Sequence, residues 1–132
     1  MASNIRFSNP PAIPKPGGYT HVVEITGPAR IVYIAGQLGF GHDGKVGDFR
    51  AQAVQAFENL KAALASVGAT FDQVVKLNNY LVDIKTNLSI YREVRDKYVN
   101  TASPPASTTI GVPALARADA LYEVEAIVML PK

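Results

Sequence analysis

The sequence predicts an α+β domain, with one mixed β-sheet and two helices on one of its faces. The expected elements follow the order β-β-α-β-α-β-β, in which strands are too frequent for a regularly alternating α/β fold. Residues 121–129 alternate between an apolar face and a face with two carboxylates, as one strand of such a sheet would. The length of 132 residues suits a single domain, so residues 1–132 are taken as one unit.

Composition excludes several classes of protein. Hydrophobic residues make up 48% and charged residues 18% of the chain, which indicates a globular domain. The net charge of +2 is too balanced to favour nucleic acid or an anionic membrane as a partner. The absence of cysteine excludes disulfides, thiolate zinc sites and a cysteine nucleophile. Without a transmembrane run of about 18 apolar residues or a signal-peptide core, we expect a cytoplasmic protein.

The first third of the chain reads as an extended arm followed by a hairpin. Residues 1–18 contain four prolines and end in a glycine pair, which indicates an extended segment and then a turn. Residues 21–26 and 30–35 are predicted strands, and Gly27-Pro28 between them is a turn signal. We therefore expect these two strands to pair with each other.

Two helices are expected. Asp48 is a suitable N-cap for a helix over 49–67, and Gly68 is a suitable left-handed C-terminal residue. Thr86 could cap a second helix over 87–99. Each helix has apolar residues at three- and four-residue steps, which predicts one buried face. These are Phe49, Ala53, Phe57, Leu60, Leu64 and Val67 in the first helix, and Leu88, Tyr91, Val94 and Tyr98 in the second.

The later strands complete the sheet and leave one face without a cover. Strands are expected over 74–83, 106–112 and 121–129. With both helices on one side, no predicted element remains for the other side. A second subunit is the natural cover for such a face.

The last strand carries the most informative polar residues. Glu123 and Glu125 share one face of an otherwise apolar strand, and neither carboxylate can be buried unpaired at low cost. Two interpretations remain open. Either the two carboxylates are solvated on an edge strand, or one lies in a pocket with a raised pKa and performs proton chemistry.

Common catalytic and metal-binding motifs are missing. His21 and His42 have no metal-ligand spacing to each other or to a carboxylate, so no metal site is expected. Gly39-x-Gly41-x-x-Gly44 matches a dinucleotide fingerprint formally, but it opens no helix and is better explained as a loop. No bound cofactor is expected.

Four segments, taken together and in order, resemble the Rid/YjgF family of reactive-intermediate deaminases, also described as endoribonuclease L-PSP. The similarity extends over nearly the whole chain, and the ordered set is more specific than any one motif. The segments are Gly17-Gly18-Tyr19, Ile34-Ala35-Gly36-Gln37, Val74-Val75-Lys76 and Glu123-Val124-Glu125-Ala126-Ile127.

The resemblance implies a chorismate-mutase-like α+β fold. It also implies a homotrimer in which the sheets form a central barrel, with the helices outside and small-molecule clefts between subunits. The best-known members hydrolyse imines and enamines to ketoacids and ammonia and need no cofactor. In these members an arginine after Pro-Ala holds the substrate carboxylate, and a glutamate of the last strand positions water.

The family's site can be placed on this sequence residue by residue. Glu123 matches the water-positioning glutamate and is the expected catalytic residue, while Glu125 is the second carboxylate of the same motif. The expected substrate-binding residues are Tyr19, Ala35, Gly36, Ser107 and Thr109. Ala35 stands where the family often has serine.

Ser107 stands where the deaminases have arginine, so the chain resembles an arginine-lacking branch. Serine cannot hold a carboxylate as an ion pair, and it is smaller than arginine. We therefore expect the binding site at this position to be roomier and more neutral. If a carboxylate is nevertheless bound, Lys76 or Arg117 is the expected basic group.

Three functions follow from the resemblance. The first is hydrolysis of an imine or enamine intermediate at clefts between subunits. The second is a trimer that binds a small metabolite without turnover. The third is an endoribonuclease, which the near-neutral charge does not favour.

Overall fold

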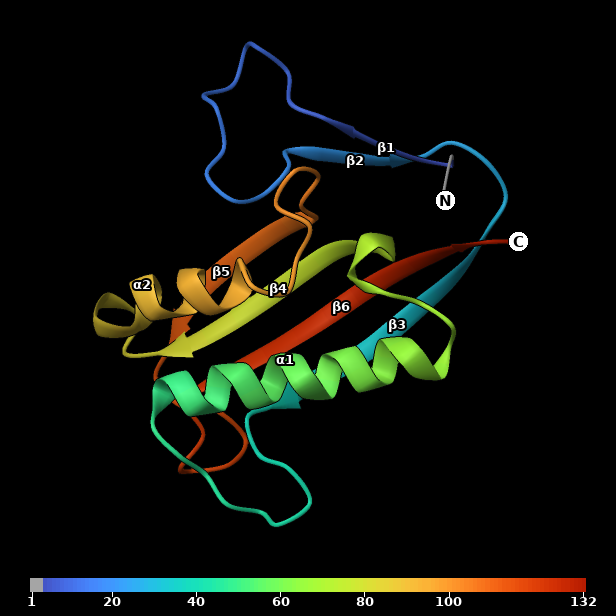
Figure 1. Cartoon of the computed structure of the whole chain (residues 1–132). Helices are drawn as coiled ribbons and strands as arrows, with labels where there is room; N and C mark the ends of the chain where they lie inside the picture. The colour runs from blue at the N-terminus through green and yellow to red at the C-terminus, as the bar shows by residue number, and fades with distance from the viewer. Residues whose placement is uncertain (1–3) are drawn as a thin grey trace.

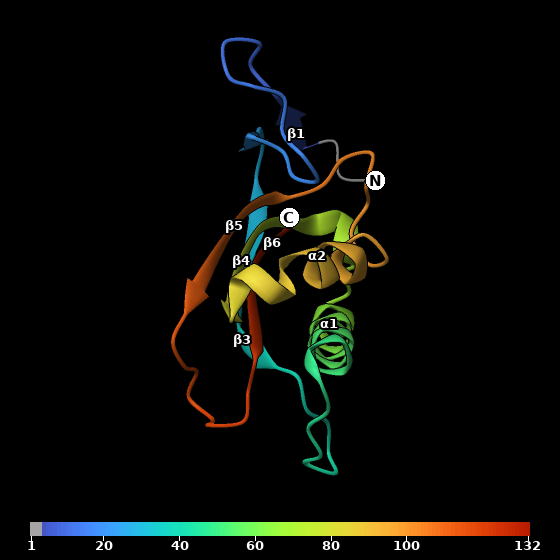
Figure 2. The same cartoon turned by 90° about the vertical axis from the view of Figure 1, so that its left-hand side faces the viewer.

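The computed structural model describes residues 4–132 and consists of a four-stranded mixed sheet with two helices on one face (Figures 1 and 2). The strands are ordered β3 (Ala29–Leu38), β6 (Tyr122–Pro131), β4 (Val74–Val82) and β5 (Ala106–Val112). β6 is antiparallel to both of its neighbours, whereas β4 and β5 are parallel. The predicted α+β fold with both helices on one side is confirmed.

The predicted hairpin between the first two strands is wrong. β2 (Val22–Ile25) instead pairs with β1 (Ile5–Ser8) in a separate two-stranded sheet, so the proline-rich arm itself contains a strand. Residues 1–3 of the arm lie outside the described residues. Two-residue hairpin loops need a residue at positive φ, and Gly27 does not adopt one. β3 pairs with β6 instead, with an irregularity between Ile34 and Gln37.

α1 (Phe49–Ser66) begins and ends as expected. The Asp48 carboxylate accepts a hydrogen bond of 2.9 Å from the backbone N–H of Ala51, which satisfies a free donor of the first turn. Gly68 has φ 77°, a conformation that glycine adopts without steric cost. The predicted stripe is buried except for the half-buried Val67. A short 3₁₀ turn, Phe71–Gln73, follows and was not predicted.

α2 (Ile84–Arg95) begins before the predicted start. Its N-cap is Asp83 in the left-handed region, at φ 53°, and Thr86 lies inside the first turn. Beyond Arg95 the chain continues as turns in which the N–H groups of Lys97 and Tyr98 bond carbonyls three residues back. The predicted boundaries of 87–99 were therefore about one turn too late at both ends.

The core lies between the helices and the sheet. The apolar face of β6 faces α1 and is 3% exposed or less at each position, as the alternation predicted; its members are Tyr122, Val124, Ala126 and Val128. Phe57 of α1 stacks on Tyr122 and on Tyr98, so aromatic rings join the first helix, the last strand and the turn after α2.

The opposite face of the sheet, called the open face below, has no helix over it (Figure 2). It exposes Ile31, Tyr33 and Ile110, and Tyr33 is 76% exposed. β6 lies in the middle of the sheet with partners on both sides, so the interpretation of its carboxylates as residues of an edge strand is wrong.

Candidate functional site

A small pocket of about 240 Å³ lies between α2, β5 and the Gly17-Gly18 turn. It brings together three of the residues that the sequence nominated, although they come from distant parts of the chain. They are Tyr19, Ser107 and Thr109; Tyr91, Arg92 and Arg95 also line the pocket. We call it the α2–β5 pocket.

A buried asparagine organises the strand side of this pocket. Asn79 of β4 is 1% exposed and donates from Nδ2 to Ser107 Oγ at 3.1 Å and to Thr109 Oγ1 at 3.4 Å. The Tyr122 hydroxyl in turn donates to Asn79 Oδ1 at 2.8 Å. Because both pocket hydroxyls accept from Asn79, their own protons remain available to a ligand.

The pocket is positively charged. Arg92 and Arg95 both line it, and none of its lining residues is acidic. The prediction of a neutral spot, made from Ser107 alone, does not fit this lining. Neither basic residue proposed as a substitute lines the pocket. Lys76 donates to Thr108 Oγ1 on the open face at 2.8 Å, and Arg117 pairs with Asp119 and stacks on Phe40.

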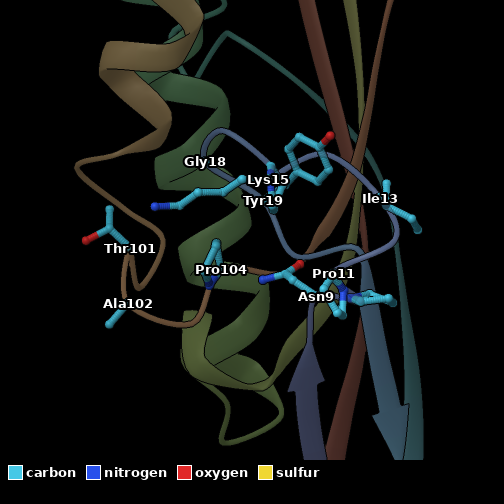
Figure 3. Close-up of a pocket in the computed structure, with 11 residues that line it drawn as sticks. Asn9, Pro11, Ile13, Lys15, Gly18, Tyr19, Thr101, Ala102 and Pro104 are labelled. Atoms are coloured by element: carbon cyan, nitrogen blue, oxygen red, sulfur yellow. The ribbon is translucent and has the colours of Figure 1, made fainter.

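A larger cavity of about 490 Å³, shown in Figure 3, shares Tyr19 with the α2–β5 pocket. It lies between the N-terminal loop, which supplies Ile13 and Lys15, and the segment before β5, which supplies Thr101 and Pro104. Tyr19 lines both spaces. This tyrosine therefore stands between the two cavities and can contact a ligand in either.

The predicted catalytic carboxylate lies on the open face. Glu123 is half-buried, and burial, aided by the charge of Glu125, raises its pKa above the ordinary value of 4.5. Within residues 4–132 the Glu123 carboxylate makes no hydrogen bond or ion pair. Glu125, by contrast, accepts from Asn78 at 3.0 Å and from Tyr80 at 3.2 Å. Glu123 is thus the carboxylate that remains free for a ligand or water.

Gly36 and Ala35 lie near these carboxylates. A Cβ at position 36 would overlap the Glu123 carboxylate, so glycine permits the close approach. Ala35 falls in the irregular part of the β3–β6 pairing and lines a cavity of about 490 Å³ with Tyr33, Asn78 and Glu125. These two predicted binding residues therefore belong to the open face.

The nominated residues form two groups within one chain. Asn79, which bonds the pocket residue Ser107, and its partner Tyr122 point to the helix side. Glu123 follows Tyr122 on the same strand and therefore points to the open face. Ser107 and Glu123 also lie on strands separated by β4. A single chain does not bring Tyr19, Ser107 and Thr109 to the Glu123 carboxylate.

Two residues of the pocket were missed from the sequence. Tyr91 was assigned to the core, and Arg95 was not singled out at all. A signal for Arg95 was available, because it is four residues after Tyr91 and seven after Leu88, on the apolar side of α2. A charged residue at such a position is either paired or functional.

A metal site and a membrane-spanning helix are both absent from the described part of the chain. Residues 4–132 contain no group of three His, Cys, Asp or Glu side chains placed to hold a metal ion. No helix within the same residues has the length and apolar character needed to cross a bilayer.

The fold is that of an α+β domain, and its α2–β5 pocket is lined largely by polar and charged side chains. The chain belongs to the Rid/YjgF family: residues 10–130 match the family described as Endoribonuclease L-PSP. The recognition made from the four sequence segments is therefore confirmed.

Individual relatives agree with this assignment. A protein of Dermatophagoides farinae described as 2-iminobutanoate/2-iminopropanoate deaminase is 32% identical over 95% of this chain and 96% of its own length. A Yersinia pestis crystal structure, described as a protein of unknown function of the conserved Rid family, is 37% identical with a TM-score of 0.88, over 96% of this chain and 99% of that one. RidA from a Psychrobacter species is 34% identical with a TM-score of 0.71, over 86% and 89%.

Proposed function

We propose that this protein is a Rid-type hydrolase that deaminates an imine or enamine intermediate. The observation that carries the proposal is the free carboxylate of Glu123, whose pKa is raised and which faces the space beside Gly36. Similarity to a relative described as an iminobutanoate/iminopropanoate deaminase supports the choice of reaction.

The proposed chemistry is addition of water across a C=N bond. The Glu123 carboxylate accepts a proton as water adds to the imine carbon, and it returns the proton to the nitrogen. In the second step the carboxylate takes the hydroxyl proton of the adduct and passes it to the nitrogen. The oxygen lone pair then forms the carbonyl as the C–N bond breaks, and ammonia leaves. A raised pKa suits this double role because the group must both accept and donate a proton near neutral pH.

We further propose that the complete site forms between subunits of a homotrimer. One chain separates the α2–β5 pocket from Glu123 by the thickness of the sheet, so a ligand that touches both needs a second copy. The exposed apolar side chains of the open face, led by Tyr33, suit such an interface. In this arrangement the open face of one subunit carries Glu123 to the pocket of its neighbour.

Replacement of Glu123 by glutamine tests the catalytic role. Imines are generated with an amino-acid oxidase, and their lifetime is followed by trapping. Glu123→Gln should lose turnover while ligand binding persists, and Glu93→Gln, an exposed surface change, should keep wild-type turnover. Equal turnover in wild type and Glu123→Gln would refute the proposal. Wild-type protein that binds ketoacids without any imine hydrolysis would instead favour a metabolite-binding trimer.

A further inference from the structure

We propose that Arg95 of α2 selects a ligand carboxylate in the α2–β5 pocket. The arginine that binds the ligand would thus come from a helix and not from the strand position that Ser107 occupies in this chain. The presence of an anion site rests on the pocket itself. The identity of its ligand, the carboxylate of a small 2-imino acid, rests on the proposed function.

The pocket offers donors and almost no acceptors. The hydroxyls of Ser107 and Thr109 accept from Asn79 and keep their protons for a ligand. Arg95 uses only Nε among the described residues, in a bond of 2.9 Å to Asp96, so its two terminal nitrogens remain free. With a second arginine, Arg92, and no acidic side chain in the lining, the pocket suits an anion.

Tyr91 gives an independent reason to expect a polar ligand. Its side chain is 1% exposed and lines the pocket, yet its hydroxyl has no hydrogen-bond partner in the described part of the chain. Burial raises the pKa of Tyr91, and the nearby Thr109, Arg95 and Ser107 oppose this increase. None of these three side chains makes a hydrogen bond to the Tyr91 hydroxyl. A buried hydroxyl without a partner is costly, and a ligand oxygen would satisfy it.

Arg95 is held in place before any ligand arrives. Its residue is only 7% exposed, and its guanidinium carbon lies 5.6 Å from the centre of the Tyr91 ring. Gly18 has φ 83°, and a Cβ there would overlap the guanidinium. The Gly17-Gly18 turn therefore closes over Arg95, and a ligand meets a preorganised cation rather than a mobile surface side chain.

The size of the pocket limits the ligand. A volume of about 240 Å³ holds about eight water-sized atoms at roughly 30 Å³ each. A carboxylate, an adjacent C=N group and a short side chain fill that space. Ligands of this class include the imino acids that arise when small amino acids lose hydrogen at the α-carbon.

The test measures binding of 2-oxobutanoate, a stable ketoacid of this size, by isothermal titration calorimetry. Arg95→Gln should weaken binding about tenfold to one-hundredfold, because a charge-assisted pair is lost. Arg50→Gln makes the same charge change at the surface, where Arg50 pairs with Glu93, and should leave affinity unchanged. Wild type should bind the neutral 2-oxobutanamide more weakly than the ketoacid by a similar factor.

A double variant separates a lost contact from a damaged fold. Arg95→Gln with Ser107→Arg returns the cation to the strand position, and it should recover affinity for 2-oxobutanoate. If Arg95→Gln fails to fold, ¹⁵N NMR of the wild-type arginine Nε–H groups serves instead. The Nε–H signal that is absent from the spectrum of Arg95→Lys belongs to Arg95. In the wild-type spectrum this signal must shift when 2-oxobutanoate is added.

The inference is overturned if folded Arg95→Gln binds the ketoacid as wild type does, or if the Arg95 signal does not move. Its failure is distinguishable from failure of the proposed function. Imine hydrolysis with an unchanged KM in Arg95→Gln would refute the inference alone. Arg95-dependent binding of 2-oxobutanoate without hydrolysis would refute the proposed reaction alone.

Discussion

The carboxylate of Glu123 lies directly against the backbone of Gly36, in the space that a Cβ at position 36 would occupy. The two residues come from neighbouring strands, β3 and β6, near an irregularity in their pairing. A methyl group at position 36 would overlap the end of the flexible Glu123 side chain. The carboxylate would therefore move, and the backbone of β3 would stay in place. The position of the proposed base therefore depends on the absence of a side chain at Gly36.

Gly36→Ala should lower imine hydrolysis strongly with little loss of stability. The added methyl group turns the Glu123 carboxylate out of its position, and misplacement of a catalytic group by about 1 Å can cost a factor of about 100 in rate. Thermal unfolding and hydrolysis are measured on the same samples. Gly27→Ala is the matched control, because a Cβ there meets only Asn4 Cβ, at 3.6 Å. Wild-type activity in Gly36→Ala would contradict the assigned role of Glu123.

The acid limb of the pH–rate profile should shift when Glu125 is neutralised. The pKa of Glu123 is raised by burial and then by the negative charge of Glu125. Glu125→Gln removes the second cause, so the pKa of Glu123 should fall toward its ordinary value. A base must be deprotonated to act, so Glu125→Gln should remain active at a lower pH than wild type.

The same shift should appear without any assay of turnover. ¹³C NMR of labelled Glu carboxyls can follow Glu123 from below pH 4 to above pH 8. An unchanged or higher Glu123 pKa in Glu125→Gln would show that the two carboxylates are not coupled. Glu24→Gln is the control, since Glu24 lies in the separate β1–β2 sheet and pairs with Arg6.

Tyr122→Phe should destabilise the fold and loosen the pocket. The change leaves Asn79 Oδ1 buried without its donor, and loss of one partner of a buried hydrogen bond costs about 1–3 kcal/mol. Chemical denaturation gives the change in the free energy of unfolding. Tyr98→Phe removes an exposed bond to Glu58 and should stay within about 0.5 kcal/mol of wild type. Equal effects of the two changes would contradict the structural role of Asn79.

Wild-type protein should elute as a trimer with about three times the chain mass by light scattering. Tyr33→Asp should dissociate the trimer, because it replaces the most exposed large apolar residue of the open face with a charged one. That charge would be costly to bury between subunits. Val54→Asp puts the same charge on the exposed side of α1 and should remain trimeric. A monodisperse wild-type monomer would contradict the proposal that subunits share the site.

Local chemistry accounts for the parts of the fold that were predicted correctly. Asp48 caps α1 because a carboxylate one residue before the helix can reach a free N–H of its first turn. The buried face of β6 was readable because side chains on any strand alternate. Glu123 and Gly36 were nominated as site residues from the family resemblance, and the structure places the Glu123 carboxylate against Gly36.

Contacts between residues far apart in the chain account for the parts of the structure that were not predicted correctly. The segments on either side of Gly27-Pro28 resembled a hairpin, yet β3 pairs with β6, about a hundred residues later in the chain. Arg95 looked like one of several surface charges of a helix. Only the closure of the Gly17-Gly18 turn over α2 buries it beside Tyr91 and Ser107.

The amino-acid sequence by itself determined both helices, the strands from β2 to β6, the buried faces of α1 and β6, and the family. These depend on periodicity and capping, which act over a few residues, and on the ordered segments shared with the family. The tertiary structure alone decided that Ser107 sits in a positively charged pocket and that Glu123 lies on the opposite face of the same sheet. Charge and burial at a site are sums over neighbours that are distant in the chain, and folding alone brings those neighbours together.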